Sequence, residues 1–137
     1  MKKLAALGLV VVLALPFALS RVTGGRATAA ADEGAKIVHD VYFSLKEDSA
    51  DNRKKLVEAC KKLLTNHPGE DHFAVGPRAE EFSGQYNDRE FDVALHIVFK
   101  DKAAHDKYQQ SPRHRQFIEE NRESLKNVRV FDSEARE

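Results

Sequence analysis

The sequence predicts an α+β domain in which two helices cover one face of a four-stranded antiparallel sheet. Two segments, 37–46 and 91–100, alternate apolar and polar residues with the period of two that is typical of half-buried strands. Each is followed by a segment in which apolar residues recur at helical spacing instead. Two further segments, 71–82 and 127–132, have the character of shorter strands.

The first strand and helix are marked by clear signals. One face of the strand is apolar except for a histidine: Ile37, His39, Val41, Phe43 and Leu45. Ser49 is a good helix N-cap, with acidic Asp51 in the first turn. The apolar stripe of the helix consists of Leu56, Ala59, Cys60, Leu63 and Leu64. Asn66-His67-Pro68-Gly69 then ends the helix.

The second half repeats this order. In segment 71–82, Gly76-Pro77 interrupts the strand, which indicates an edge strand or a bulge. In segment 91–100 one face is wholly apolar, with Phe91, Val93, Leu95, Ile97 and Phe99. Asp101 caps a helical region that extends to about Leu125 and is divided by Pro112. The expected buried stripe of its second part is Phe117, Ile118, Asn121 and Leu125.

The resulting order is β-α-β-β-α-β, the split-βαβ or ferredoxin-like arrangement with both helices on one face of the sheet. The other face mixes Val38, Tyr42, Ala94 and Val98 with polar Asp40, Ser44 and His96. Such a face is too apolar to lie bare in water, and the chain offers no further element to cover it. The sequence therefore predicts a homodimer in which two sheets pack face to face.

The N-terminal 29 residues have the pattern of a signal peptide. Lys2 and Lys3 precede an apolar run from Leu4 to Leu19, and small residues up to Ala29 offer cleavage sites. That run of 16 residues is shorter than the roughly 20 needed to cross a bilayer, which favours a signal peptide over an uncleaved N-terminal anchor. We expect an exported chain with a linker at 30–35 and a domain at 36–134, attached to a membrane only if the signal is not cleaved.

Charge excludes one class of partner. Lys2, Lys3, Arg21 and Arg26 precede Ala29, and no acidic residue does. Removing these four from the 22 basic residues leaves 18 against 22 acidic ones, a net charge of −4. A nucleic-acid-binding protein needs a basic footprint, so we expect no nucleic acid partner. Because Cys60 is the only cysteine, an internal disulfide is excluded as well.

Four stretches, taken in order, resemble the stress-responsive α/β-barrel domain (Dabb) family. They are Val38–Lys46, Phe91–Phe99, Tyr108–Phe117 and Val130–Asp132. The resemblance covers the whole predicted domain and implies a dimeric ferredoxin-like α/β barrel. Most members have no assigned activity, so it implies a dimeric protein that is non-catalytic or binds a small apolar ligand.

Some plant relatives in this family are polyketide cyclases, and their catalytic pattern matches three residues here. The resemblance implies His114 as general base, helped by Tyr108 and by His39 on the first strand. Imidazole suits proton abstraction near neutral pH, and a phenol suits stabilisation of an oxyanion. The chain departs from these cyclases at two positions. Ser111 precedes Pro112, where the cyclase pattern has a His-Pro pair, and Cys60 lies where the cyclases carry a tyrosine.

Two readings of His39, Tyr108 and His114 therefore stay open. They are structural or ligand-binding residues of the fold, or they form the site of a cofactor-independent enzyme of the polyketide-cyclase or small-monooxygenase type. No Gly-rich phosphate loop is present in the domain, and we expect no cofactor. The remaining histidines, including His67, His72 and His105, lack the spacing of metal ligands, and we expect no metal site.

Overall fold

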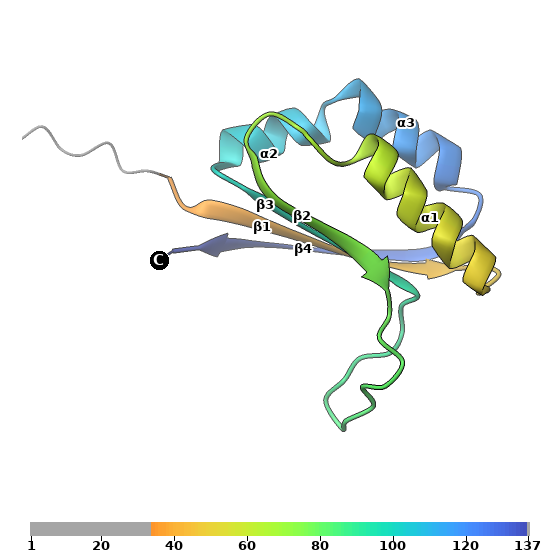
Figure 1. The fold of residues 1–137 in the computed structure, drawn as a ribbon. Helices are drawn as coiled ribbons and strands as arrows, with labels where there is room; N and C mark the ends of the chain where they lie inside the picture. Colours follow the sequence, from red (N-terminus) through yellow and green to blue (C-terminus); the bar gives the residue numbers. More distant parts are fainter. Residues whose placement is uncertain (1–33, 137) are drawn as a thin grey trace, which may run out of the picture.

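A computed structural model describes residues 34–136 of the chain, drawn in Figure 1. The elements are β1 (Lys36–Leu45), α1 (Ala50–Leu63), β2 (Glu70–Pro77), β3 (Val93–Phe99), α2 (Lys102–Gln109), α3 (Pro112–Asn121) and β4 (Leu125–Ala135). The predicted signal peptide at 1–29 lies outside the described residues, as does most of the predicted linker. Among the residues described, no helix is both long and apolar enough to pass through a membrane.

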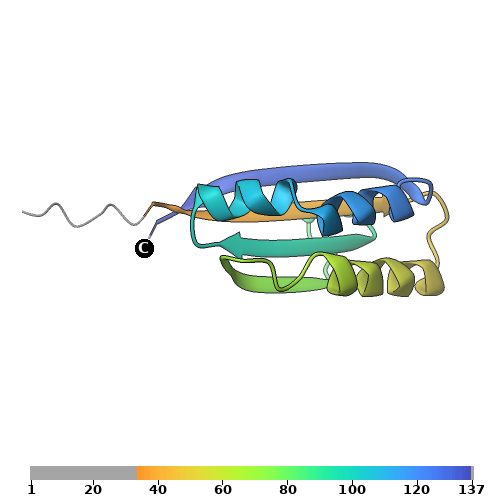
Figure 2. The ribbon, with the colours of Figure 1, turned by 90° about the horizontal axis from the view of Figure 1, so that it is seen from above.

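The strands form one antiparallel sheet in the order β2-β3-β1-β4, and the helices lie on one face of it. The predicted ferredoxin-like α+β fold is confirmed, and so is the edge position of β2. Figure 2, viewed from above, shows α1 over the β2 side of the sheet and α2 and α3 in succession over β1. No helix lies over β4 in this view, and Val128 and Val130 of β4, which line a pocket together with helix residues, are 43% and 49% exposed.

The core lies between the helices and the faces predicted to be apolar. On β3, Val93, Leu95, Ile97 and Phe99 are fully buried. On α1, the buried residues are Leu56, Val57, Cys60 and Leu63. Burial raises the pKa of the Cys60 thiol to about 12, so Cys60 stays protonated and packs as a small apolar residue. The predicted stripe is confirmed for Leu56, Cys60, Leu63 and Leu64, whereas Ala59 is only partly buried and Val57 is buried in addition.

The helix starts are fixed by three side-chain caps. Ser49 accepts a hydrogen bond from the backbone N–H of Asn52, and Asp101 accepts one from Ala104. Ser111 does the same for His114 and is followed by Pro112 at the first position of α3. As predicted, the proline divides the second helical region, because it cannot supply the N–H that a continuous helix needs.

The prediction for the start of β3 was wrong by two residues. The strand begins at Val93, so the alternation does not extend to Phe91, whose ring lies 5.0 Å from that of Tyr42 on the other side of the sheet. Asp92, which the alternation would place on the face opposite Phe91, is buried, and its Oδ2 accepts a hydrogen bond of 2.7 Å from the backbone N–H of Leu45. A tertiary hydrogen bond thus overrides the local pattern.

Three further boundaries also differ from prediction. α3 ends at Asn121 and Leu125 belongs to β4, which continues beyond Asp132. Of the predicted buried stripe of α3, only Phe117 is buried. Ile118 is 48% exposed and lines a pocket together with Val128 and Val130 of β4. β2 ends at Pro77 and not at Phe82, since proline lacks the N–H that would continue the ladder.

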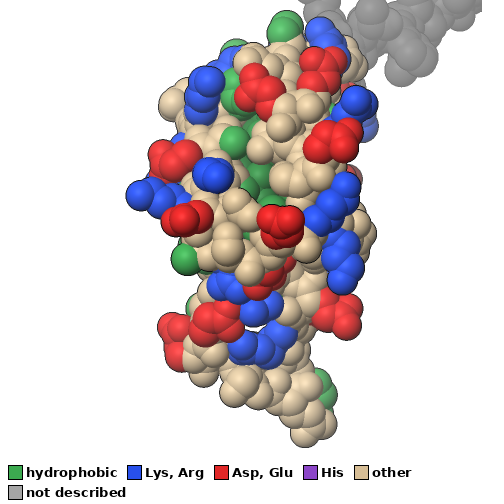
Figure 3. Space-filling model, turned by 90° about the vertical axis from the view of Figure 1, so that its right-hand side faces the viewer, with side chains coloured by type: hydrophobic (Ala, Val, Ile, Leu, Met, Phe, Trp, Pro, Cys, Tyr) green, Lys and Arg blue, Asp and Glu red, His purple; other side chains and the backbone are tan. Residues whose placement is uncertain are grey.

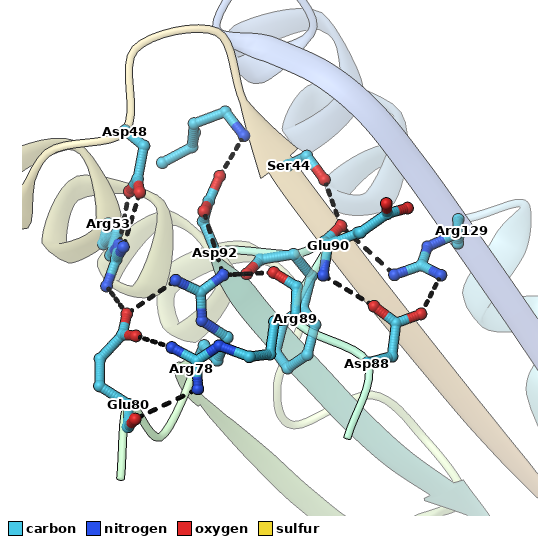
Figure 4. Close-up of polar contacts among 12 residues, drawn as sticks. Ser44, Asp48, Arg53, Arg78, Glu80, Asp88, Arg89, Glu90, Asp92 and Arg129 are labelled. Atoms are coloured by element: carbon cyan, nitrogen blue, oxygen red, sulfur yellow. Dashed lines mark hydrogen bonds and ion pairs between the residues drawn. The ribbon is translucent and has the colours of Figure 1, made fainter. Parts of the chain in front are cut away.

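The segment from Arg78 to Asp92 extends away from the helices, on the opposite side of the sheet (Figure 1). Figure 4 shows that arginine–carboxylate pairs brace it. The carboxylate of Glu80 accepts hydrogen bonds from the guanidinium groups of Arg53 and Arg78, at 2.9 Å each, and of Arg89, at 2.6 Å. Because Arg53 belongs to α1, the loop is fastened to the body of the domain at its base.

Charged side chains of both signs are mixed on the surface. On the face drawn in Figure 3, basic and acidic residues lie interspersed around a central strip of hydrophobic ones. A polyanion needs a continuous basic stripe, and this face does not supply one.

Candidate functional site

The three residues singled out in the sequence line one pocket. It has a volume of about 490 Å³ and lies between the sheet and the α2–α3 segment, next to the uncovered β4. His39 comes from β1, Tyr108 from α2 and His114 from α3. Most of the other walls are apolar, with Val41, Phe43, Phe117, Ile118, Val128 and Val130.

Tyr108 lies between the two histidines. Its ring centroid is 5.6 Å from that of His39 and 4.8 Å from that of His114. The break at Pro112 makes this arrangement, since it turns the chain between Tyr108 and His114. The structure thus brings the three residues together, while their catalytic role stays a prediction.

His39 is buried and held by a carboxylate. Its Nδ1 lies 2.6 Å from Oδ1 of Asp132, its directly paired residue on β4. Burial lowers the pKa of His39, and the Asp132 carboxylate opposes that shift. With Nδ1–H donating to Asp132, Nε2 is left without a proton in the neutral ring. The sequence did not single out Asp132, because only the β1–β4 register places it beside His39.

His114 is held differently, since its buried Nδ1 has no hydrogen-bond partner. Structural histidines normally have their buried nitrogens satisfied, as Nε2 of His67 is by the Leu63 carbonyl at 3.1 Å. Burial lowers the pKa of His114, a hydrogen bond with the backbone of Gln109 opposes this shift, and the nearby imidazoles of His39 and His67 lower the pKa further. His114 is therefore a neutral imidazole at physiological pH.

Tyr108 remains a phenol under ordinary conditions. Its side chain is buried, and burial raises its pKa well above the usual value. Its ring also meets that of His67 edge to face, with the centroids 4.9 Å apart. A protonated phenol beside a neutral imidazole is a pair that can donate and accept hydrogen bonds at one end of an apolar pocket.

His105 is a second residue, after Asp132, that the sequence analysis did not identify as part of the site. Its ring centroid lies 5.2 Å from that of His39, and its Nε2 is 3.5 Å from Oδ1 of Asp132. A signal was available, because His105 and Tyr108 are three residues apart and share one face of α2. What the sequence could not show is that this face meets His39.

Comparison with protein families gives a match to the stress-responsive A/B barrel domain over residues 37–135. The chain belongs to this family. The family assignment made from the four stretches is therefore confirmed. No match was found among the curated proteins compared with the chain.

Solved structures with similar folds come from bacteria and plants. A Dabb family protein from Mesorhizobium loti is 24% identical, with a TM-score of 0.62 over 75% of this chain and 99% of that one. A dimeric ferredoxin-like protein of unknown function from Thermobifida fusca is 19% identical, with a TM-score of 0.63 over 75% and 93%. A hydroxynitrile lyase from Passiflora edulis is 17% identical, with a TM-score of 0.60 over 75% and 95%. At such identities the likeness is one of fold.

The lowered pKa of His114 predicts acid sensitivity. The unfolded chain binds a proton at this residue below its ordinary pKa of about 6.5, whereas the folded chain binds it only at lower pH. The free energy of unfolding should thus fall as pH drops below about 6.5, with a slope for this residue of at most about 1.4 kcal/mol per pH unit. Urea unfolding of wild type and of His114→Asn between pH 5 and 8 tests this, and equal slopes would contradict it.

Proposed function

We propose that this protein binds a small, largely apolar molecule that carries one polar group, in the pocket that His39, Tyr108 and His114 line. The observation that carries the proposal is that these three side chains come from three different elements and meet in one pocket of about 490 Å³. Small-molecule sites have this size, with apolar walls and a few convergent polar groups.

The unpaired Nδ1 of His114 supports a bound molecule over a purely structural role. A buried polar atom without a partner costs roughly 1–3 kcal/mol, a cost that a ligand or a small rotation of the ring can relieve. Apolar Val128 and Val130 of β4 line the same pocket and are still partly exposed. A ligand that covers them would add the hydrophobic free energy of their burial.

Binding can be tested on a panel of small aromatic phenols and ketones by ligand-observed NMR. His114→Ala should remain folded by circular dichroism and should bind the polar members about 3–10-fold more weakly, the worth of one hydrogen bond. The matched control is His72→Ala, an exposed histidine of β2 that does not line the pocket. Binding by no member, or equal binding by both variants, would count against the proposal.

A second candidate is a cofactor-independent enzyme with His114 as general base. The observation that favours it is a neutral imidazole beside a protonated phenol, with ring centroids 4.8 Å apart. His114 would remove a proton next to a carbonyl, and Tyr108 would donate a hydrogen bond to the resulting oxyanion.

Proton abstraction leaves a direct trace, since a ketone in D₂O exchanges its α-hydrogens for deuterium. His114→Ala should slow protein-dependent exchange by about 100-fold or more, and Tyr108→Phe should slow it with little effect on ketone binding. Exchange that is absent in wild type, or that survives in His114→Ala, would eliminate this candidate and leave binding as the function.

We infer that the chain forms a homodimer through the face of the sheet opposite the helices, which is called the open face below. Tyr42 is at the centre of an aromatic cluster there, with ring centroids 5.0 Å from Phe91, 5.8 Å from Phe131 and 6.0 Å from His96. The polar residues of this face are already paired, as Nδ1 of His96 lies 2.7 Å from Oδ1 of Asp40. Covering the face would therefore leave neither of these two groups without a partner.

The loop at 78–92 extends this surface. Tyr86 is 92% exposed, and with Tyr42, Phe91 and Phe131 it lines a second hollow of about 490 Å³. A tyrosine held out in this way is a typical anchor residue in an interface. The Thermobifida fusca protein is described as dimeric, which supports a dimer for this chain as well.

Export is proposed on the sequence of residues 1–29 alone, which the structure does not describe. The charged start and the apolar run through Leu19 support it. The test is the mass of the chain recovered from the producing cells, which should lack the signal peptide. A chain of full mass that is not associated with a membrane would argue against both a signal peptide and an anchor.

A further inference from the structure

Beside the pocket, three metal-ligating side chains from three elements meet at one point. They are His39 of β1, His105 of α2 and Asp132 of β4, and one ligand atom of each lies within 4.8 Å of the others. Oδ1 of Asp132 is 2.6 Å from Nδ1 of His39 and 3.5 Å from Nε2 of His105. Imidazole nitrogen and carboxylate oxygen are the ligands that Zn²⁺ and its neighbours in the first transition row accept.

We propose that His39, His105 and Asp132 bind one divalent transition-metal ion of the Zn²⁺ class. Zn–N and Zn–O bonds are about 2.0–2.2 Å, which places tetrahedral ligand atoms about 3.4 Å apart. The distance from Asp132 to His105 has this value already. The shorter distance to His39 is that of a hydrogen bond. It would widen when the metal replaces the proton on Nδ1, and the ring stays neutral because Nε2 then carries the proton.

The electrostatics of His105 favour a cation at this point. The side-chain amide nitrogen of Gln109 lies 3.3 Å from Nε2 of His105, and a metal ion bound to the lone pair of Nε2 would take the place of this contact. The Asp132 oxygen that faces this nitrogen carries negative charge. A lone pair and a carboxylate oxygen at such a distance repel each other unless a cation lies between them.

The surroundings also match those of a metal site. Nδ1 of His105 lies 3.7 Å from Oδ1 of Asp106, which is longer than a hydrogen bond but adds a second negative charge next to the His105 ring. Side-chain exposure rises from 3% at His39 to 14% at His105 and 47% at Asp132. An ion can therefore enter from the Asp132 side, and the fourth position of a tetrahedral ion would face water.

The site would adjoin the ligand pocket but does not depend on the proposed function. His39 belongs to both, since it lines the pocket and supplies Nδ1 to the metal. His105 and Asp132 are not pocket-lining residues. Loss of metal binding on replacement of His105 or Asp132 is thus separable from loss of ligand binding on replacement of His114.

The test is isothermal titration of Zn²⁺ into the chelator-treated full chain, made without a histidine tag, with Co²⁺ absorption as a second readout. We expect one Zn²⁺ per chain and visible Co²⁺ bands of a four- or five-coordinate site. His105→Ala and Asp132→Ala should each weaken binding by more than about 100-fold, beyond the 10–100-fold loss typical of outer-shell changes.

Two other histidines serve as matched controls. His72→Ala on β2 and His96→Ala on the open face of the sheet should bind Zn²⁺ as wild type does, because neither residue belongs to the cluster. Absence of saturable Zn²⁺ binding by the wild type would overturn the proposal. So would unchanged binding by His105→Ala, or an equal loss in His96→Ala.

Discussion

Replacing Phe99 with alanine is expected to lower the free energy of unfolding by about 3–5 kcal/mol, the usual cost of deleting a buried phenylalanine. The ring is 0% exposed and lies at the end of β3, where it packs against the side chains of the candidate site. Its centroid is 5.0 Å from that of Tyr108, 5.6 Å from that of His105 and 6.5 Å from that of His39. Deletion would leave a cavity directly behind these three rings.

The measurement is equilibrium unfolding in guanidinium chloride at one fixed protein concentration, because association contributes to the stability of a dimer. Phe82→Ala is the matched control, since Phe82 is 62% exposed and its loss should cost no more than about 0.5 kcal/mol. Similar losses in the two variants would contradict the packing derived for Phe99. Zn²⁺ binding should weaken in Phe99→Ala as well, as His39 and His105 lose the ring that supports them.

Replacing Tyr42 with aspartate is expected to convert the dimer into folded monomers at micromolar concentration. The phenol is at the centre of the aromatic cluster on the open face, next to Asp40, so a new carboxylate would be buried beside a like charge. In a two-fold symmetric dimer each substitution enters the interface twice. We expect the dissociation constant to rise by at least about 100-fold.

Sedimentation equilibrium measures this effect, with circular dichroism to show that the variant is folded. Ile118→Asp is the control: Ile118 is also a partly exposed apolar residue, but it lies on α3 at the helix side of the sheet. That variant should remain dimeric. A wild type that sediments as a monomer, or a Tyr42→Asp variant that stays dimeric, would refute association through the sheet.

The two faces of the sheet have separate roles in these proposals. The helix face holds the pocket and the His39–His105–Asp132 cluster, and the opposite face carries the surface proposed for association. β1 connects them, because His39 and Tyr42 point to opposite faces of the same strand. Ligand binding and dimerisation can therefore be altered by separate substitutions.

The sequence alone was sufficient for the architecture. Strict alternation in β1 and β3 identified the buried face, and Ser49, Asp101 and Pro112 fixed where helices start. These signals are local, since period and capping depend on residues within a few positions of each other. They fail where a distant group intervenes, as at Asp92, which is buried because the backbone of Leu45 binds it.

The candidate site was only partly visible in the sequence. His39, Tyr108 and His114 were found through family resemblance, and the tertiary structure showed that they share a pocket. Asp132 ends one of the stretches that carried the resemblance, but the resemblance gave neither Asp132 nor His105 a role in the site. Asp132 meets His39 through the register of β1 and β4, and His105 reaches both through the packing of α2 on the sheet. Local patterns determine which face a residue occupies, but only the packing of distant elements decides which side chains meet.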